Sequence, residues 1–251
     1  MIRRDALTKY LDDLLQVTAF EDYCPNGLQV QGRDAVRKIA GGVTACQALV
    51  DAAVAAGADA LLVHHGYFWK GEDPRITGIK YRRLKALMDA GINLLAYHLP
   101  LDAHPELGNN AQLAALLGFK SEGGFGGRGP AIGQYGSLDE ALKPDELAAR
   151  ITQRLGRAPL HIQGSAAQIR TIAWCSGAAQ GYLEQAAALG VDAYLSGEIS
   201  EQTVHQAREL GIHFYSAGHH ATERYGVQAL GAHLAARFGV EFQFVDIENP
   251  V

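Results

Sequence analysis

Two stretches of the chain decide its fold. Residues 39–65 read IAGGVTACQALVDAAVAAGADALLVHH, and residues 172–198 read IAWCSGAAQGYLEQAAALGVDAYLSGE. Each stretch begins with a short apolar run, continues through an alanine-rich helical segment and ends in a second apolar run, which predicts a strand–helix–strand unit. Aligned without gaps, the two share Gln47 and Gln180, Gly57 and Gly190, and Asp59 and Asp192. This common register indicates a duplicated α/β unit.

The alternation of strands and helices continues on either side of these stretches. In the first half we expect helices over residues 5–17, 84–90 and 109–117 and a strand over 92–97. In the second half we expect strands over 160–163, 212–217 and 241–247 and helices over 202–210 and 221–238. Such alternation predicts largely parallel sheets covered by helices. The fold class is therefore α/β, with two similar units, residues 1–125 and 126–251, packed around a shared cleft.

A glycine-rich segment lies where these two halves meet. Residues 121–136 contain seven glycines. The segment does not end in the Gly-Lys-Ser/Thr sequence of a phosphate-binding loop. We therefore interpret it as a flexible connection between the halves.

Composition narrows the class of protein. The 251 residues are 48% hydrophobic and 20% charged, as in globular chains, and the net charge of −5 argues against nucleic acid as a partner, although a local basic patch would still allow it. The most apolar stretch, residues 52–63, contains Asp59 and is too short to span a membrane. The charged N-terminal residues do not fit a signal peptide, so we expect a cytoplasmic protein. Isolated Cys24, Cys46 and Cys175 predict neither a disulfide nor a thiolate zinc site.

Histidines and carboxylates follow the predicted strands of both units. His64 and His65 end the second strand of the first unit, and Glu198 ends its counterpart. The next strand of each unit is followed by His98-x-x-x-Asp102 or by His219-x-x-x-Glu223. Because ligands gather at the carboxyl ends of parallel strands, we expect these side chains at one edge of the fold.

The spacing of these residues favours metal binding. His64 and His65 reach a common site only where the strand breaks, which Gly66 permits. His219 and Glu223 share one face of the following helix. Imidazoles and carboxylates without thiolate suit Zn, Mn, Fe, Co or Ni, and carboxylates can bridge two ions. The remaining candidates are interpreted as structural or surface histidines: His104, His161, His205, His213 and His233.

Five motifs of the chain are long and specific. They are Pro25-Asn-Gly-Leu-Gln-Val30, His64-His-Gly-Tyr-Phe-Trp-Lys-Gly71, His98-Leu-Pro-Leu-Asp-Ala-His-Pro-Glu-Leu-Gly-Asn-Asn110, Ser196-Gly-Glu198 and Gly218-His-His-Ala-Thr-Glu-Arg224. With these motifs the chain resembles the YbgI-like proteins, also called GTP cyclohydrolase 1 type 2 homologs or Ngg1-interacting-factor-like proteins. The resemblance covers nearly the whole chain and is weakest over residues 121–136. The chain lacks the large inserted domain of some longer members.

The resemblance implies a dinuclear metal centre and a hexameric ring. The family's metal ligands correspond to His64, His65, Asp102, His219 and Glu223. His98 and Glu198 are then neighbours that orient the ligands or take part in catalysis. The implied cofactor is two divalent metal ions per subunit, of unspecified identity.

Two functions follow from this interpretation. The first is a metal-dependent hydrolase that opens the guanine imidazole ring of GTP with activated water, and His98 or Glu198 would carry the proton. The second is a metal-stabilised ring that binds a partner protein or nucleic acid without catalysis. Vacant coordination positions favour the hydrolase. Cationic candidates for the phosphates are Lys70, Arg75, Lys80, Arg82, Arg83 and Arg224.

Overall fold

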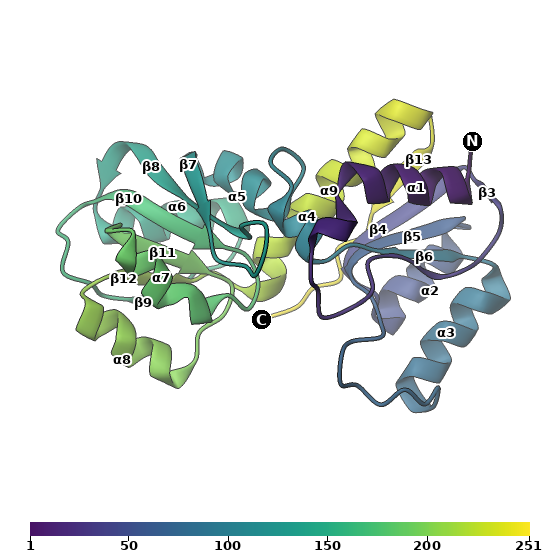
Figure 1. The fold of residues 1–251 in the computed structure, drawn as a ribbon, viewed down its shortest axis with the longest axis horizontal. Helices are drawn as coiled ribbons and strands as arrows, with labels where there is room; N and C mark the ends of the chain where they lie inside the picture. The colour runs from purple at the N-terminus through teal and green to yellow at the C-terminus, as the bar shows by residue number, and fades with distance from the viewer. The chain divides into compact units, whose positions relative to one another are not determined.

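The structure is a computed structural model that describes residues 1–251, and the chain divides into two compact units (Figure 1). Unit 1 comprises residues 1–101 and 226–248, and unit 2 comprises residues 102–225 and 249–251. This division differs from the single boundary after residue 125 that the sequence predicts. The units are discontinuous because the last strand, β13 (Glu241–Phe244), pairs with β4 (Lys38–Thr44) of the first sheet.

Unit 1 contains a five-stranded sheet. Its strand order is β13, β4, β5 (Ala60–His65), β6 (Asn93–Ala96) and β2 (Gly27–Val30). The first four strands run parallel, and β2 runs antiparallel to β6. A separate two-stranded sheet joins β1 (Ile2–Arg3) to β3 (Ala35–Val36).

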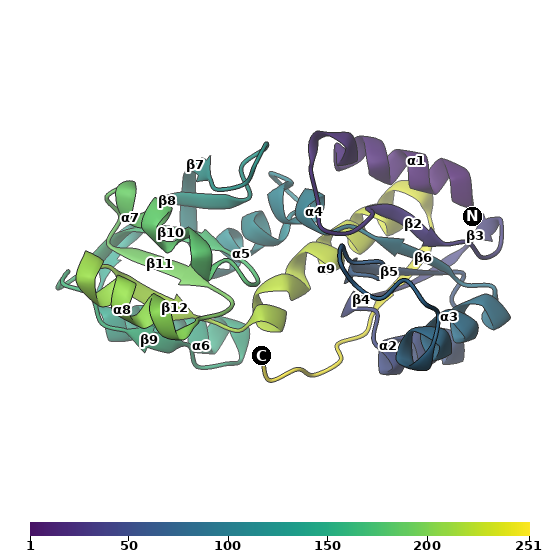
Figure 2. The same cartoon turned by 60° about the horizontal axis from the view of Figure 1, so that its bottom comes forward.

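Helices cover both faces of the unit 1 sheet. Figures 1 and 2 show α1 (Arg4–Leu14) and the C-terminal part of α9 (His219–Phe238) on one face, and α2 (Gln47–Ala55) and α3 (Gly78–Ala90) on the other. A short 3-10 turn, η1 (Val17–Ala19), follows α1. Alternate strand residues such as Leu61 and Val63 pack on the α2 and α3 side, which buries an apolar core.

Unit 2 contains a six-stranded mixed sheet. Its order is β7 (Phe119–Phe125), β8 (Gly133–Leu142), β10 (Ile169–Cys175), β11 (Ala193–Ser196), β12 (His213–Ser216) and β9 (Leu160–Ile162). The three strands β10, β11 and β12 are parallel, and the others are antiparallel to their neighbours.

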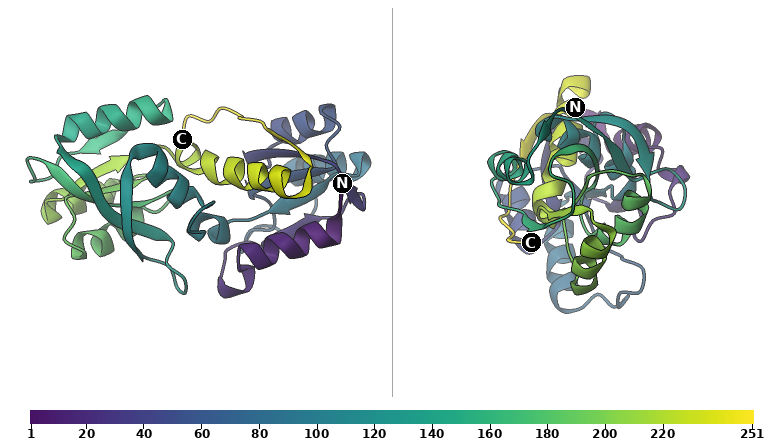
Figure 3. Two further views of the ribbon diagram at one scale, coloured as in Figure 1. Left: turned by 90° about the horizontal axis from the view of Figure 1, so that it is seen from above. Right: turned by 90° about the vertical axis from the view of Figure 1, so that its left-hand side faces the viewer.

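The helices of unit 2 also lie on two faces of the sheet. On one face, α5 (Asn109–Leu117) and α6 (Pro144–Leu155) bury Trp174 and Ile172. On the other face lie η2 (Gln180–Tyr182), α7 (Leu183–Ala188) and α8 (Glu201–Leu210), and Figure 3 shows α6 and α8 on opposite sides of the sheet. The short helix α4 (Leu99–Ala103) crosses the boundary between the two units in sequence.

The pairing register confirms the predicted duplication. Ile39 of β4 pairs with Ala60 of β5, and the equivalent Ile172 of β10 pairs with Ala193 of β11. The common register extends to the loops, because Asp59 accepts hydrogen bonds from the backbone N–H groups of Arg37 and Lys38. Asp192 does the same for Arg170 and Thr171. Each carboxylate therefore ties the start of the first strand to the start of the second.

The equivalence of the two units shifts after the third strand. The backbone N–H of Tyr97 donates to the carbonyl of Val63, and that of Ala217 donates to the equivalent Ser196. His98 is therefore equivalent to Gly218 rather than to His219. The two His-x-x-x-carboxylate motifs follow equivalent strands, as predicted, but they are offset from each other by one residue.

The glycine-rich segment is not a flexible connection, so that interpretation was wrong. Residues 119–125 and 133–142 form the antiparallel strands β7 and β8, which lie together within unit 2. A Cβ atom on Gly136 would overlap the carbonyl group of Lys120 on the neighbouring strand. The glycines therefore permit close approach of two strands, which a count of flexible residues does not reveal.

None of the helices combines the length and the hydropathy that a membrane span requires. This finding agrees with the hydropathy of the sequence, in which the most apolar stretch is interrupted by Asp59.

The Asp59 carboxylate gives a stability prediction. Burial alone would raise its pKa, but hydrogen bonds from Arg37, Lys38 and Arg33 outweigh burial and lower the pKa. A lowered folded-state pKa stabilises the protein above the unfolded value of about 3.9, and that stabilisation is lost as the pH falls through the folded value. We expect Asp59→Asn to lower the free energy of unfolding by about 2 kcal/mol at neutral pH.

Urea denaturation of both proteins from neutral pH down to about pH 3 would measure the difference. The difference in the free energy of unfolding should shrink as the pH falls below about 4, because the Asp59 carboxylate of the unfolded chain then takes up a proton before that of the folded protein. Asp13→Asn is the control, because Asp13 forms only an exposed ion pair with Lys9 and should change stability little. Equal changes in the free energy of unfolding for the two substitutions would show that the hydrogen bonds to Asp59 do not stabilise the fold.

Candidate metal centre

Strand β5 of unit 1 ends in two adjacent imidazoles. The strand stops at His65, and the ring centroids of His64 and His65 lie 4.6 Å apart. A Cβ atom on the next residue, Gly66, would overlap the side chain of Gln29. The Gln29 amide oxygen accepts a hydrogen bond from the backbone N–H of Tyr67 at 2.7 Å. Glycine at position 66 therefore leaves room for Gln29 to hold the backbone just after the strand, and the two histidine rings lie close together.

Hydrogen bonds hold the Nδ1 atoms of both histidines. Nδ1 of fully buried His64 donates to the backbone carbonyl of Tyr97 at 2.9 Å. Nδ1 of His65 is hydrogen-bonded to the hydroxyl of Thr44, its partner across the β4–β5 ladder, at 3.0 Å. With Nδ1 engaged in each ring, Nε2 is the nitrogen that can bind a metal.

His98 lies beside this pair. Its ring centroid is 5.0 Å from that of His64 and 5.7 Å from that of His65. The three side chains each offer a nitrogen within 4.8 Å of the others, which is a group that can hold a metal ion. The edge of the Trp69 ring also contacts His98, with centroids 5.0 Å apart. Unit 1 thus brings together three of the predicted site residues.

Unit 2 brings together three further predicted residues at the start of α9. His219 is the first residue of the helix, and its Nε2 lies 3.1 Å from Oε2 of Glu223, one turn later. Its Nδ1 donates to Oε1 of Glu198 at 2.6 Å. Burial alone would lower the pKa of His219, but the two carboxylates outweigh burial and raise it to about 9. A cation at Nε2 would replace the proton that this environment favours.

Glycine at position 177 is required beside this cluster. Gly177 has a positive φ of 66°, and a Cβ atom there would overlap Oε1 of Glu223. The Glu223 side chain is also buried, with 3% of its surface exposed. The backbone thus approaches the carboxylate closely enough to fix its position.

Asp102 is held by a separate network in unit 2. Its Oδ1 accepts hydrogen bonds from Asn109 Nδ2 at 2.9 Å and from Ser176 Oγ at 3.0 Å. Asn110 supports the same network, because its side chain accepts from the Ser176 backbone and its carbonyl accepts from the Trp174 indole. The side chain of Asp102 therefore has a single defined orientation.

Sequence reasoning missed the residues that orient these side chains. Among them are Asp22, Thr44, Asn109 and Ser176, which hold His98, His65 and Asp102. Two of these residues could have been found by their closeness to the quoted motifs. Asn109 lies within one motif, and Asp22 lies three residues before Pro25-Asn26-Gly27. The sequence around Thr44 gives no such indication, because the role of Thr44 depends on which residue it faces across the β4–β5 ladder.

Several of the remaining histidines have structural roles. His104 Nδ1 accepts hydrogen bonds from the backbone N–H groups of Glu106 and Leu107. His161 stacks on His213 and is hydrogen-bonded to it at 3.0 Å. His233 is hydrogen-bonded to the hydroxyl of Tyr10 at 2.6 Å.

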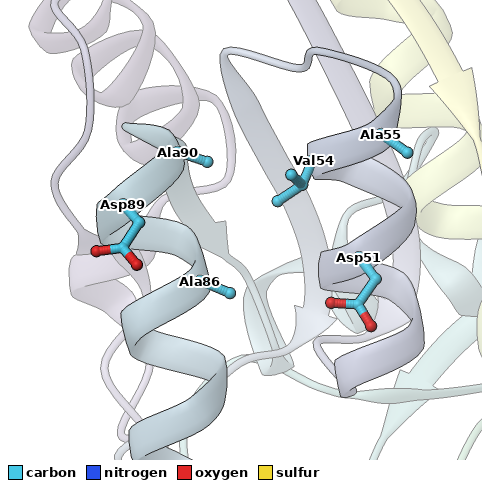
Figure 4. Close-up of a pocket in the computed structure, with 6 residues that line it drawn as sticks. All are labelled: Asp51, Val54, Ala55, Ala86, Asp89 and Ala90. Atoms are coloured by element: carbon cyan, nitrogen blue, oxygen red, sulfur yellow. The ribbon is translucent and has the colours of Figure 1, made fainter.

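A groove of about 480 Å³ lies between α2 and α3 (Figure 4). It is lined by Asp51, Val54, Ala55, Ala86, Asp89 and Ala90. Both carboxylates have partners, since Asp51 accepts from Gln47 and Asp89 pairs with Lys85. The groove lies along the C-terminal halves of these helices, away from the strand ends that carry the histidines.

Comparison with known proteins identifies the family. The model for the family Duf34/NIF3 (NGG1p interacting factor 3) matches residues 2–250. The chain belongs to this family. The resemblance expected from the sequence motifs is therefore confirmed.

Relatives of this NIF3-family chain match it along its whole length. A Pseudomonas aeruginosa protein named GTP cyclohydrolase 1 type 2 homolog is 58% identical over 250 residues and 99% of both chains. An Escherichia coli K12 protein of the same name is 51% identical over 99% of this chain and 100% of its own. The solved structure of protein ybgI has a TM-score of 0.96 and 50% identity, with both chains fully covered. TTHA1606 from Thermus thermophilus has a TM-score of 0.91 and 38% identity, also over both full chains.

The hydrogen bond between Thr44 and His65 gives a prediction for metal binding. Thr44→Val keeps the shape of the side chain but removes the partner of His65 Nδ1. We expect the dissociation constant for a divalent metal to rise about tenfold, as for other residues that orient ligands.

Calorimetric titration with Zn²⁺ or Mn²⁺ would measure this affinity. Thr152→Val is the matched control, because its hydroxyl bonds only to the exposed α6 backbone carbonyl of Ala148. Unchanged affinity in Thr44→Val would show that the hydrogen bond does not support a metal ligand.

Proposed function

We propose that this NIF3-family chain is a dinuclear-metal-dependent hydrolase. The residues that would hold two divalent ions are His64, His65, Asp102, His219 and Glu223. The observation that carries the proposal is that four of these five side chains have an orienting hydrogen-bond partner within their own unit. Such partners are typical of metal ligands and are not needed by solvated side chains.

The chemistry of the donors fits such a centre. Three imidazoles and two carboxylates, without thiolate, suit Zn, Mn, Fe, Co or Ni. The two carboxylates, Asp102 and Glu223, are both buried, so a nearby cation would offset a charge that is costly to desolvate. Five protein ligands for two ions also leave coordination positions for water or substrate.

The bound ions would lower the pKa of a water molecule and polarise the bond that is attacked. The chain itself supplies the proton carrier. His98 donates from Nδ1 to Asp22, so its Nε2 is the nitrogen that takes up a proton. Glu198 instead orients His219, because its oxygen is engaged with Nδ1 of that ring. We therefore assign proton transfer to His98 and ligand orientation to Glu198.

The substrate we infer is GTP or a related nucleotide, and the reaction is hydrolytic opening of the guanine imidazole ring. Support comes from relatives named GTP cyclohydrolase 1 type 2 homolog that share more than half of their residues with this chain. Among the cationic candidates, Arg75 pairs with Asp73 and Lys80 pairs with Glu72. Lys70 is exposed, follows Trp69 directly, and is the cation we assign to the phosphates.

The alternative is a metal-stabilised protein that binds a partner without catalysis. The orienting hydrogen bonds are equally compatible with that role. What favours the hydrolase is His98, which lies beside the ligand pair with a buried carboxylate behind it, an arrangement that binding alone does not need.

The ligand carboxylates give the first test. We expect Asp102→Ala and Glu223→Ala each to lose at least one ion per chain and to abolish hydrolysis, because only carboxylates can bridge two cations. Metal content by mass spectrometry and turnover of GTP would be measured for both. His104→Ala is the control, since His104 caps a loop and should keep both ions. Wild-type metal content in Asp102→Ala would remove the ligand assignment, and full turnover without metal would remove the mechanism.

We also propose that the chain assembles into a closed hexameric ring. Closed assemblies form when one interface repeats by rotation. Light scattering at micromolar concentration should give about six times the 26.9 kDa mass of one chain. A mass equal to one chain across a tenfold range of concentration would contradict the assembly.

A further inference from the structure

Asp22 is a buried carboxylate outside every motif discussed so far. It lies between η1 and β2, and its side chain is 3% exposed. Oδ1 accepts hydrogen bonds from His98 Nδ1 at 2.7 Å and from the Tyr23 backbone at 2.6 Å. Oδ2 accepts from Asn26 Nδ2 at 2.8 Å and from the Leu99 backbone at 3.0 Å. Each carboxylate oxygen of Asp22 therefore accepts two hydrogen bonds.

Four donors keep this side chain in its ionised form. Burial alone would raise the pKa of Asp22, but the hydrogen bonds from His98, Asn26 and Tyr23 outweigh burial and lower the pKa. An ionised carboxylate can only accept hydrogen bonds. The hydrogen of the neutral His98 imidazole must therefore lie on Nδ1, which leaves the lone pair on Nε2.

The surroundings of His98 hold its ring in this orientation. The backbone N–H of His98 donates to Asn26 Oδ1 at 2.7 Å. The rings of Trp69 and Tyr23 are in T-shaped arrangements with the His98 ring, with centroids 5.0 and 6.4 Å away. The side chain is 14% exposed, and the hydrogen bond to Asp22 is made by its Nδ1 atom. The choice of tautomer thus decides what Nε2 offers to a substrate.

A metal site at Asp22 is the competing interpretation. Asp22, Cys24 and His98 each offer a donor atom within 4.8 Å of the others. However, burial and the charge of Asp22 raise the pKa of the Cys24 thiol to about 12, so it stays protonated and is a poor ligand. The four donors also occupy both carboxylate oxygens. Hydrogen bonding to His98 accounts for the geometry without an ion.

We propose that Asp22 is a positioning residue that fixes His98 as the Nδ1–H tautomer, so that Nε2 accepts the proton of the attacking water. The catalytic part rests on the proposed hydrolase function, whereas the tautomer does not. As the water oxygen bonds to C8 of guanine, one water proton passes to Nε2 and from there to N7, whose double bond to C8 has opened. When the C8–N9 bond then breaks, the C8 hydroxyl becomes a formyl group. Its proton passes through Nε2 to N9, which restores the neutral imidazole.

The tautomer can be observed without substrate or metal. Solid-state ¹⁵N NMR of metal-free protein labelled with ¹⁵N-histidine distinguishes protonated from unprotonated ring nitrogens, and His98→Gln identifies the His98 signals. At a pH where the ring is neutral, we expect Nδ1 of wild-type His98 to carry the hydrogen. An Nε2–H tautomer in the wild type would overturn the proposal.

Asp22→Asn tests the role of the carboxylate. The amide group presents a donor to His98 Nδ1, so we expect the ring to change to the Nε2–H tautomer and kcat/KM to fall at least about 100-fold with little change in KM. Asp13→Asn is the control, because the Asp13 carboxylate pairs with Lys9 at an exposed position and not with His98. It should leave the tautomer and the rate unchanged.

The outcomes separate the two proposals. An unchanged tautomer in folded Asp22→Asn would overturn the positioning role. A changed tautomer in a protein whose wild type turns over no nucleotide would support the positioning role and overturn the proposed hydrolase.

Discussion

A histidine binds a metal well when its second ring nitrogen is held by a hydrogen bond. The three candidate ligand histidines of this chain all meet that constraint. His64 donates to a carbonyl, His65 is bonded to a hydroxyl, and His219 donates to a carboxylate. Each partner belongs to the backbone or side chains of the same unit as its histidine. The ring orientations are therefore established by the folding of each unit.

The rigidity of these partners comes from the sheets. The carbonyl that accepts from His64 belongs to Tyr97, whose N–H donates to β5 and whose hydroxyl donates to Asp12. Thr44 faces His65 across the β4–β5 ladder. Because both partners sit at the ends of paired strands, neither can move without breaking the ladder. Strand ends thus combine accessible side chains with a fixed backbone.

Duplication explains why the two units share a scaffold but differ at their sites. Asn93 and His213 occupy equivalent buried positions, and each accepts a hydrogen bond from a backbone N–H, of Gly32 or of Gly164. Two different side chains therefore satisfy the same buried backbone groups. At the strand ends the units diverge, since His64 and His65 in one correspond to Gly197 and Glu198 in the other. At the end of this strand, unit 1 therefore supplies two imidazoles and unit 2 supplies one carboxylate.

The sequence by itself determined the α/β class, the repeated unit and the candidate ligands, because these depend on local periodicity and on residue types at strand ends. Helix α5 was predicted with the same bounds that the structure shows. Only the tertiary structure showed that β13 pairs with β4, that glycines at 121–136 belong to two paired strands, and that Asp22 lies behind His98. Asp22 and His98 are 76 residues apart in the chain, and no local pattern encodes such a contact. Periodicity reports which face of an element is buried, whereas the partner of a buried polar group is decided by which distant segments pack together.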